Sequence, residues 1–119
     1  IFSVLISNNE EIGYNTLGYL EDNFYIKNNI KFVIALDKRE QLYATNKQFN
    51  NKSVEAIINE KGWKKKNEPD RSSNIDYFNI PGINLGIGFF NEHTQAESID
   101  LEITLKAIDL VYEIAKTLL

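Results

Sequence analysis

Residues 1–13, IFSVLISNNEEIG, are the stretch from which the fold of the chain is interpreted. The apolar, β-branched run over residues 1–7 predicts a strand that is buried on both faces. Glu10 and Glu11 follow directly, and Gly13 permits a sharp turn or a close backbone approach. The two carboxylates therefore fall at the carboxyl end of a buried strand, which is the edge where open α/β sheets bind their ligands.

The adjacent carboxylates of Glu10 and Glu11 have two interpretations. Like charges this close repel each other unless a proton or a cation compensates. The pair therefore fits a general base beside a metal ligand. It also fits two solvated carboxylates at the start of a helix, where the helix dipole favours negative charge. The motif by itself leaves both interpretations open.

The bulk composition bounds the protein class. The chain has 119 residues, which predicts one domain, and its hydrophobic content of 43% and charged content of 25% are those of a globular protein. A net charge of −4 gives a nucleic-acid role no electrostatic support. There is no cysteine, so a metal ion would be held by His, Asp or Glu.

No apolar run approaches membrane-spanning length and no signal peptide is visible, so no membrane partner and a cytoplasmic location are expected. The chain also contains no methionine and opens inside a strand-like run. We therefore expect that a natural N-terminal part is missing, cleaved or carried by another chain.

Strand and helix patterns alternate along the sequence. The last helix is the clearest: Ser98 or Asp100 can cap it, and one apolar stripe is expected to form its core-facing side. The members of this stripe are Leu101, Leu105, Ile108, Val111, Ala115 and Leu118. The other predicted elements are a helix at 14–24, a strand at 32–36 ending in Asp37, a possible strand at 42–45, a helix capped by Ser53 and closed by Gly62, a surface turn or edge strand at 64–66, a helical turn at 75–80, and a strand at 83–90.

Alternation of this kind predicts the α/β class, with a three-layer α-β-α sandwich and a mostly parallel sheet. A flavodoxin-like nucleotide-binding domain has the same alternation. It is ranked low because no strand is followed by a glycine-rich phosphate loop.

Chemistry-bearing residues follow three of the predicted strands. Glu10 and Glu11 follow the first, Asp37 follows the second, and His93, the only histidine, lies in the loop NEHTQAE after the strand at 83–90. Carboxylates and imidazole suit zinc and related divalent ions. In this order the residues resemble the dinuclear zinc exopeptidases, which include aminopeptidases, tripeptidases and related carboxypeptidases and deacylases. The segment from residue 80 to residue 119 carries the most specific part of the resemblance.

The resemblance implies that residues 1–119 are the C-terminal part of a catalytic domain, which is therefore apparently incomplete. It also implies a role for each of these residues. Glu10 corresponds to the general base that takes a proton from a metal-bound water and returns it to the leaving amine. Glu11 and His93 correspond to ligands of one zinc ion, and Asp37 corresponds to a ligand of the other; cobalt or manganese could replace zinc. Glu97 corresponds either to a partner that orients the His93 loop or to a member of a surface salt bridge.

Two features depart from the family pattern. The family also has an upstream His-x-Asp motif and a bridging Asp, neither of which is present, so the printed chain alone is not expected to be a competent enzyme. Asn74 stands where relatives carry Asp. The interval of 56 residues from Asp37 to His93 (93 − 37) leaves no room for a lid domain and fits the compact aminopeptidase-like branch. The local sequences LDKRE and HTQAE, however, resemble the carboxypeptidase and tripeptidase branch.

Two functions follow from these observations. The first is metal-dependent hydrolysis of a peptide or amide bond of the exopeptidase type, acting on a peptide or an acylated amino acid. The alternative is a non-catalytic α/β binding or scaffolding module that has lost the metal site. In either case unpaired sheet edges favour association with a missing N-terminal segment or with a homo-oligomer partner.

Overall fold

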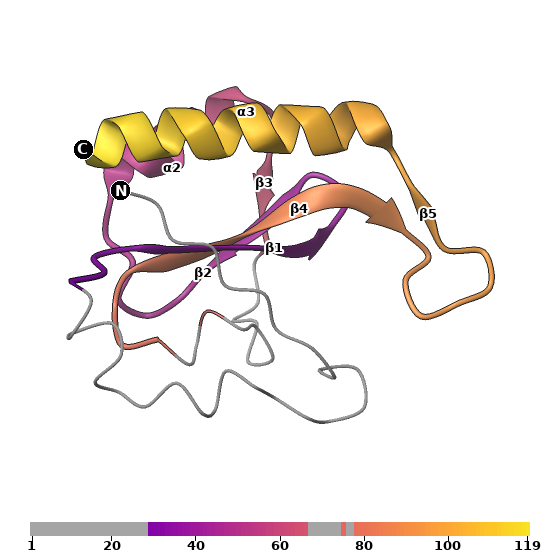
Figure 1. Cartoon of the computed structure of the whole chain (residues 1–119), viewed down its shortest axis with the longest axis horizontal. Helices are drawn as coiled ribbons and strands as arrows, with labels where there is room; N and C mark the ends of the chain where they lie inside the picture. Colours follow the sequence, from indigo (N-terminus) through magenta and orange to yellow (C-terminus); the bar gives the residue numbers. More distant parts are fainter. Residues whose placement is uncertain (1–28, 67–74, 76–77) are drawn as a thin grey trace.

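The structure is a computed structural model that describes residues 29–66, 75 and 78–119. The helix and strand predicted within residues 1–24, and most of the helical turn predicted at 75–80, lie outside these residues. The described elements, shown in Figure 1, are β1 (Val33–Arg39), β2 (Leu42–Thr45), α2 (Lys52–Glu60), β3 (Lys64–Lys65), β4 (Gly82–Phe90), β5 (Ser98–Ile99) and α3 (Leu101–Leu118).

The described strands form one mixed sheet in the order β1-β4-β2-β3, with β5 paired to β4. β4 runs parallel to β1 and antiparallel to β2 and β5, while β2 and β3 are parallel. The described part of the chain is therefore a small α/β domain in which five strands combine with two helices. β4 is its central strand, and every other strand except β3 pairs directly with it.

Both described helices lie on the same side of the sheet, where α3 runs along β4 and α2 lies beside it (Figure 1). The core fills the space between this helix layer and the sheet. Tyr43 and Trp63 are its largest side chains, and Trp63 Nε1 donates a 3.0 Å hydrogen bond to the carbonyl of Gly86. The remaining members of the core are Val54, Ile58, Ile83, Leu85, Ala107, Leu110 and Ile114.

The N-cap of α2 lies two residues before the predicted cap, Ser53. Asn51 is the N-cap, because its Oδ1 accepts a 3.0 Å hydrogen bond from the Val54 backbone N–H. Val54 and Ile58 are buried as the helical spacing predicts. The prediction that Gly62 closes the helix is confirmed, since Gly62 follows the C-cap with φ of +95°, a conformation that glycine adopts without strain.

Of the two residues predicted as possible caps of α3, Asp100 is the N-cap, and the predicted core-facing stripe is correct only in part. Asp100 Oδ1 accepts hydrogen bonds from the backbone N–H groups of Glu102 and Ile103, at 2.9 and 3.2 Å. The prediction that the stripe from Leu101 to Leu118 packs in the core is confirmed for Ala115, which is buried, and for Val111, which packs against the core, but it is wrong for the other four members, because α3 carries apolar residues on more than one side. Its buried residues are Ala107, Leu110, Ile114 and Ala115, whereas Leu101, Leu105, Ile108 and Leu118 are exposed.

The chain crosses over β4 between β1 and β2. Only Glu40 and Gln41 separate these two strands in the sequence, yet they lie on opposite sides of β4. The crossing passes over Gly86, where a Cβ atom would lie 2.6 Å from the Arg39 carbonyl oxygen and against that of Glu40. Glycine is required at this position because the backbone of another segment occupies the space of a side chain.

The remaining described segments agree with their sequence patterns. Lys64 and Lys65 form the exposed edge strand β3, as one of the two predicted alternatives has it. In the described residues, no helix has the length and apolar character that crossing a lipid bilayer requires.

Candidate metal and catalytic site

The predicted site residues divide into two groups. Glu10 and Glu11 lie outside the described residues, and so does Asn74. Asp37 and His93 are described, and the strands that lead to them, β1 and β4, are neighbours in the sheet. Hydrogen bonds of the described residues fix the backbone at Asp37 and in the loop of His93.

Asp37 lies inside β1 rather than at its end, at a bulge in the pairing with β4. Ala35 is opposite Asn84 and Lys38 is opposite Gly86, so two residues of β1 face one residue of β4. A bulge of this kind bends the strand and changes the direction of its side chains, and bulges are frequent beside functional sites. The Asp37 side chain is exposed at this bend.

The bulge at Asp37 is held by a buried amide. Asn84 is 1% exposed, and its Oδ1 accepts a 3.0 Å hydrogen bond from the Asp37 backbone N–H. A buried side chain that bonds a backbone group fixes that backbone, because breaking the bond would leave a polar group without water. Asn84 therefore sets the backbone position from which the Asp37 carboxylate projects.

His93 lies in the loop between β4 and β5, and its own φ is +63°. Left-handed backbone is uncommon for a residue with a side chain and has to be held by its surroundings. Thr94 does this within the loop, because its Oγ1 donates a 2.7 Å hydrogen bond to the Asn91 carbonyl and accepts one of 3.2 Å from the Ala96 N–H. The Glu97 N–H donates to the Thr94 carbonyl at 3.2 Å. The loop presents His93 as an exposed side chain at a tight turn.

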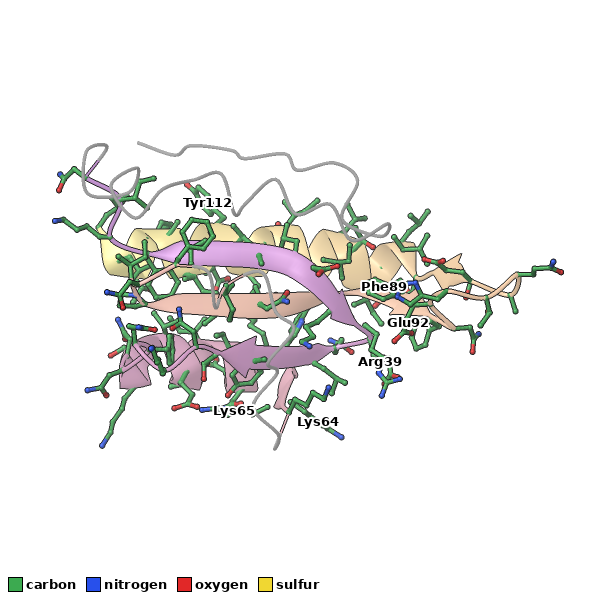
Figure 2. The ribbon with its side chains drawn as sticks, turned by 90° about the horizontal axis from the view of Figure 1, so that it is seen from below. Arg39, Lys64, Lys65, Phe89, Glu92 and Tyr112 are labelled. Atoms are coloured by element: carbon green, nitrogen blue, oxygen red, sulfur yellow. The ribbon has the colours of Figure 1, made fainter. Side chains whose placement is uncertain are left out.

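β1 and β4 are parallel, so their carboxyl ends reach the same edge of the sheet. Arg39, two residues beyond Asp37, is in register with Phe89 at this edge. Arg39 also forms an ion pair with Glu92, the residue before His93, with 3.7 Å between Nη1 and Oε1. Figure 2 shows Arg39, Phe89 and Glu92 gathered at one end of the sheet. The strand end after Asp37 and the loop of His93 are therefore neighbours.

The donor chemistry of the described pair suits zinc, since a carboxylate oxygen and an imidazole nitrogen are both common zinc ligands. A structural or catalytic zinc site needs at least three protein ligands. The described residues contain no group of three or more His, Cys, Asp or Glu side chains that could hold a metal ion. A complete site would therefore need ligands from outside the described ranges, and the predicted Glu11 is in such a position.

Three residues at this edge were not predicted from the sequence. Asn84 stands alone as a polar residue in the apolar strand INLGIGFF, and a single amide in a buried strand is the signal that could have identified it. Arg39 and Glu92 have no such signal, because the sequence does not show the register that brings β1 and the His93 loop together. The predicted orienting role of Glu97 remains a prediction, and its side chain is exposed.

A second polar cluster lies on the helix side of the sheet and is structural in character. The Tyr43 hydroxyl lies 3.1 Å from Asn59 Oδ1 and 3.3 Å from Glu55 Oε1, and Lys65 Nζ donates to Glu55 Oε1 at 2.7 Å. Burial raises the pKa of the Tyr43 hydroxyl, and the Glu55 carboxylate raises it further. The hydrogen bond from Lys65 lowers the pKa of Glu55. The cluster joins β2, α2 and β3.

Comparison with known proteins gives no assignment: no protein-family profile, no curated protein and no solved structure matches this chain at a significant level.

Proposed function

We propose that this chain takes part in the metal-dependent hydrolysis of a peptide or amide bond of the exopeptidase type, with a peptide or an acylated amino acid as substrate. Glu10 is the proposed general base, and Glu11, Asp37 and His93 are the proposed metal ligands. The proposal rests on the resemblance of the ordered motifs to the dinuclear zinc exopeptidases.

The observation that carries the proposal is the parallel pairing of β1 and β4. It brings the strand that holds Asp37 and the loop that holds His93 to one edge of the sheet, where Arg39 and Glu92 are in contact. Sites in α/β proteins form at this edge because loops from separate strands converge there. Two residues 56 positions apart (93 − 37) in the sequence thereby become candidates for a shared site.

The proposed chemistry divides between the metal and the protein. Bound divalent ions supply positive charge that polarises the scissile carbonyl and lowers the pKa of water. The Glu10 carboxylate takes the proton of the attacking water and delivers it to the nitrogen of the leaving amine. Asp37 and His93 supply ligand atoms to the metal. The Asn84 amide holds the backbone at Asp37, and the Thr94 hydroxyl holds the turn that carries His93.

The proposal includes the finer architecture expected from the sequence, a three-layer α-β-α sandwich with a mostly parallel sheet. The segments predicted at residues 1–7 and 14–24 would contribute a strand and a helix to it. A strand added beside β1 would pair with the edge that has no partner strand among the described residues. A right-handed connection from that strand to β1 would place its helix on the face opposite α2 and α3.

Cobalt binding tests the site directly, because Co²⁺ replaces zinc and gives a visible absorption spectrum. We expect the 119-residue chain to bind Co²⁺, and we expect the affinity to fall at least about tenfold in His93→Ala and in Asp37→Asn, since each removes one ligand. Glu60→Gln, at an exposed position of α2, is the matched control and should bind as the unmodified chain does. Equal Co²⁺ affinity in the unmodified chain, His93→Ala and Asp37→Asn would remove both residues from the site.

Hydrolysis of an aminoacyl amide separates the base from the ligands, and it is measured on this chain after the upstream His-x-Asp motif and the bridging Asp of the family pattern have been supplied and the protein has been loaded with metal. Glu10→Gln should lose activity by about 10²-fold or more while retaining its metal, because only the proton carrier is lost. A protein that binds no metal and hydrolyses no amide would instead be the non-catalytic α/β module.

A further inference from the structure

The loop that carries His93 is a hairpin loop closed by β4 and β5. Residues 89–90 of β4 pair with residues 98–99 of β5, and the loop extends past the end of the sheet (Figure 1). Inside the loop, Asn91 and His93 both have left-handed backbone, with φ of +54° and +63°. These pairings and the hydrogen bonds of the Thr94 hydroxyl are local to the hairpin, so they fix its internal shape.

The carboxyl end of β1 is fixed to β4 immediately before this loop begins. Arg39, the last residue of β1, is in register with Phe89. The Glu40 N–H donates a hydrogen bond to the Phe89 carbonyl, and the Gly88 N–H donates one to the Glu40 carbonyl, each at 3.1 Å. The Arg39 side chain therefore projects from a backbone that is held on both sides.

An ion pair spans from this fixed backbone to the loop. Arg39 Nη1 lies 3.7 Å from Glu92 Oε1, and Figure 2 shows the two residues together at the end of the sheet. Glu92 stands between the two left-handed residues of the loop, and its side chain is only 31% exposed. Because Glu92 directly precedes His93, a contact that fixes Glu92 also limits where the His93 backbone can lie.

We propose that Arg39 and Glu92 are positioning residues, whose ion pair holds the loop against the end of β1 so that His93 and Asp37 present their ligand atoms to the same metal site. The inference deepens the proposed hydrolase function and rests on it. An ion pair between partly exposed side chains contributes modestly, so its loss should weaken metal binding several-fold rather than abolish it.

The two charges would have opposite effects if they acted on the metal only through Coulomb's law. Arg39→Gln would then strengthen metal binding, because it removes a cation that repels the metal ion, whereas Glu92→Gln would weaken it. Loss of positioning predicts weaker binding in both variants, since either change breaks the same ion pair. The direction of the change at Arg39 therefore separates positioning from a direct charge effect.

Titration of the 119-residue chain with Co²⁺ tests this sign. We expect Arg39→Gln and Glu92→Gln each to lower the Co²⁺ affinity by about threefold. The double variant Arg39→Glu with Glu92→Arg should restore it, because it rebuilds the pair in the reverse direction. Lys61→Gln is the matched control, since it removes one cation from the ion pair with Glu113 and should leave Co²⁺ binding unchanged. Equal or tighter binding by Arg39→Gln overturns the proposal.

Hydrogen exchange without metal tests the loop separately from the proposed function. The amides of Ala96 and Glu97 donate hydrogen bonds to the Thr94 side chain and carbonyl, so they report on the loop. Both glutamine variants should exchange these amides about threefold faster, and the lysine control should not. Unchanged exchange overturns the positioning role, whether or not the chain binds metal. Faster exchange in a chain that binds no Co²⁺ overturns the proposed metal site but leaves the hold of the ion pair on the loop in place.

Discussion

Residues 82–84 of β4 pair regularly with β1 and β2, whereas both irregularities of the β1–β4 pairing lie from Leu85 onward. The amino half is fixed by burial, with Ile83 fully enclosed in the core. The carboxyl half is fixed by glycines and by a crossing segment: Gly86 lies under the backbone of Arg39 and Glu40, and Gly88 has φ of +86°.

The two halves of β4 differ in what stabilises them and in how much change they tolerate. The regular half contributes apolar burial, which tolerates small changes of volume. The irregular half lies beside Asp37, Arg39 and the His93 loop. Its geometry depends on the absence of a side chain at Gly86, because backbone atoms of the crossing segment occupy that space. Departures from regular structure are expected at functional positions, since the rest of the fold compensates for them.

The largest expected effect comes from adding one methyl group to the irregular half. Gly86→Ala should lower the free energy of unfolding by about 3 kcal/mol, since the new Cβ meets backbone carbonyls rather than movable side chains. Ile83→Val, which removes one methyl group from the regular half, should cost about 1 kcal/mol. Urea unfolding of both variants gives the comparison, and equal losses would mean that the two halves are equally tolerant.

An intermediate effect is expected at Asn84, the last residue of the regular half, whose side chain accepts a hydrogen bond from the bulge of β1. Asn84→Leu keeps the approximate volume but removes the acceptor of the Asp37 N–H, and should cost about 1–3 kcal/mol. Hydrogen exchange at the Asp37 amide should become faster, while the amide of Ile58 in α2 stays protected. Asn50→Leu, at an exposed position, is the control. Unchanged exchange at Asp37 would show that Asn84 does not hold the bulge.

The smallest effect is expected at Glu55, which contacts β4 only indirectly. Its carboxylate accepts a hydrogen bond from the Tyr43 hydroxyl, and Tyr43 in β2 pairs with Leu85 of β4. The folded state lowers the Glu55 pKa from its ordinary value of 4.5, so its contribution is complete above that pH and is lost as the pH falls through the lower, folded pKa. Glu55→Gln should therefore cost at most about 1 kcal/mol at pH 7 and nothing in strong acid. A difference that grows on acidification would contradict the lowered pKa.

The sequence predicted the described elements well where one pattern dominates. The apolar run at 32–36 and the glycine-bearing strand at 83–90 correspond to β1 and β4, and the possible strand at 42–45 corresponds to β2. The mixed sheet could not be derived in the same way, because strand direction depends on pairing between distant residues. Two-residue strands such as β5 are also too short to show the alternation of apolar and polar residues that predicts a strand.

The errors have physical causes of the same kind. Ser53 and Asn51 are both good caps, and only the hydrogen bond to the Val54 N–H distinguishes them. In α3 a helix with apolar residues on two sides offers more than one stripe, and the sequence does not show which of them meets the sheet. For the candidate site, the sequence predicted Asp37 and His93 at one edge, but the bulge, the Asn84 amide and the Arg39–Glu92 pair depend on register.

The insertion of β4 between β1 and β2 also determines an order of assembly. Residues 33–45 are synthesised well before residues 82–90, yet β1 and β2 are joined in the sheet only through β4. Until β4 has left the ribosome, β1 has no described neighbour to pair with, while β2, α2 and β3 can form a local unit. The stretch of β1 that carries Asp37 is therefore completed late in folding, and a nascent chain that stalls before β4 leaves the β4-facing edge of β1 open to aggregation.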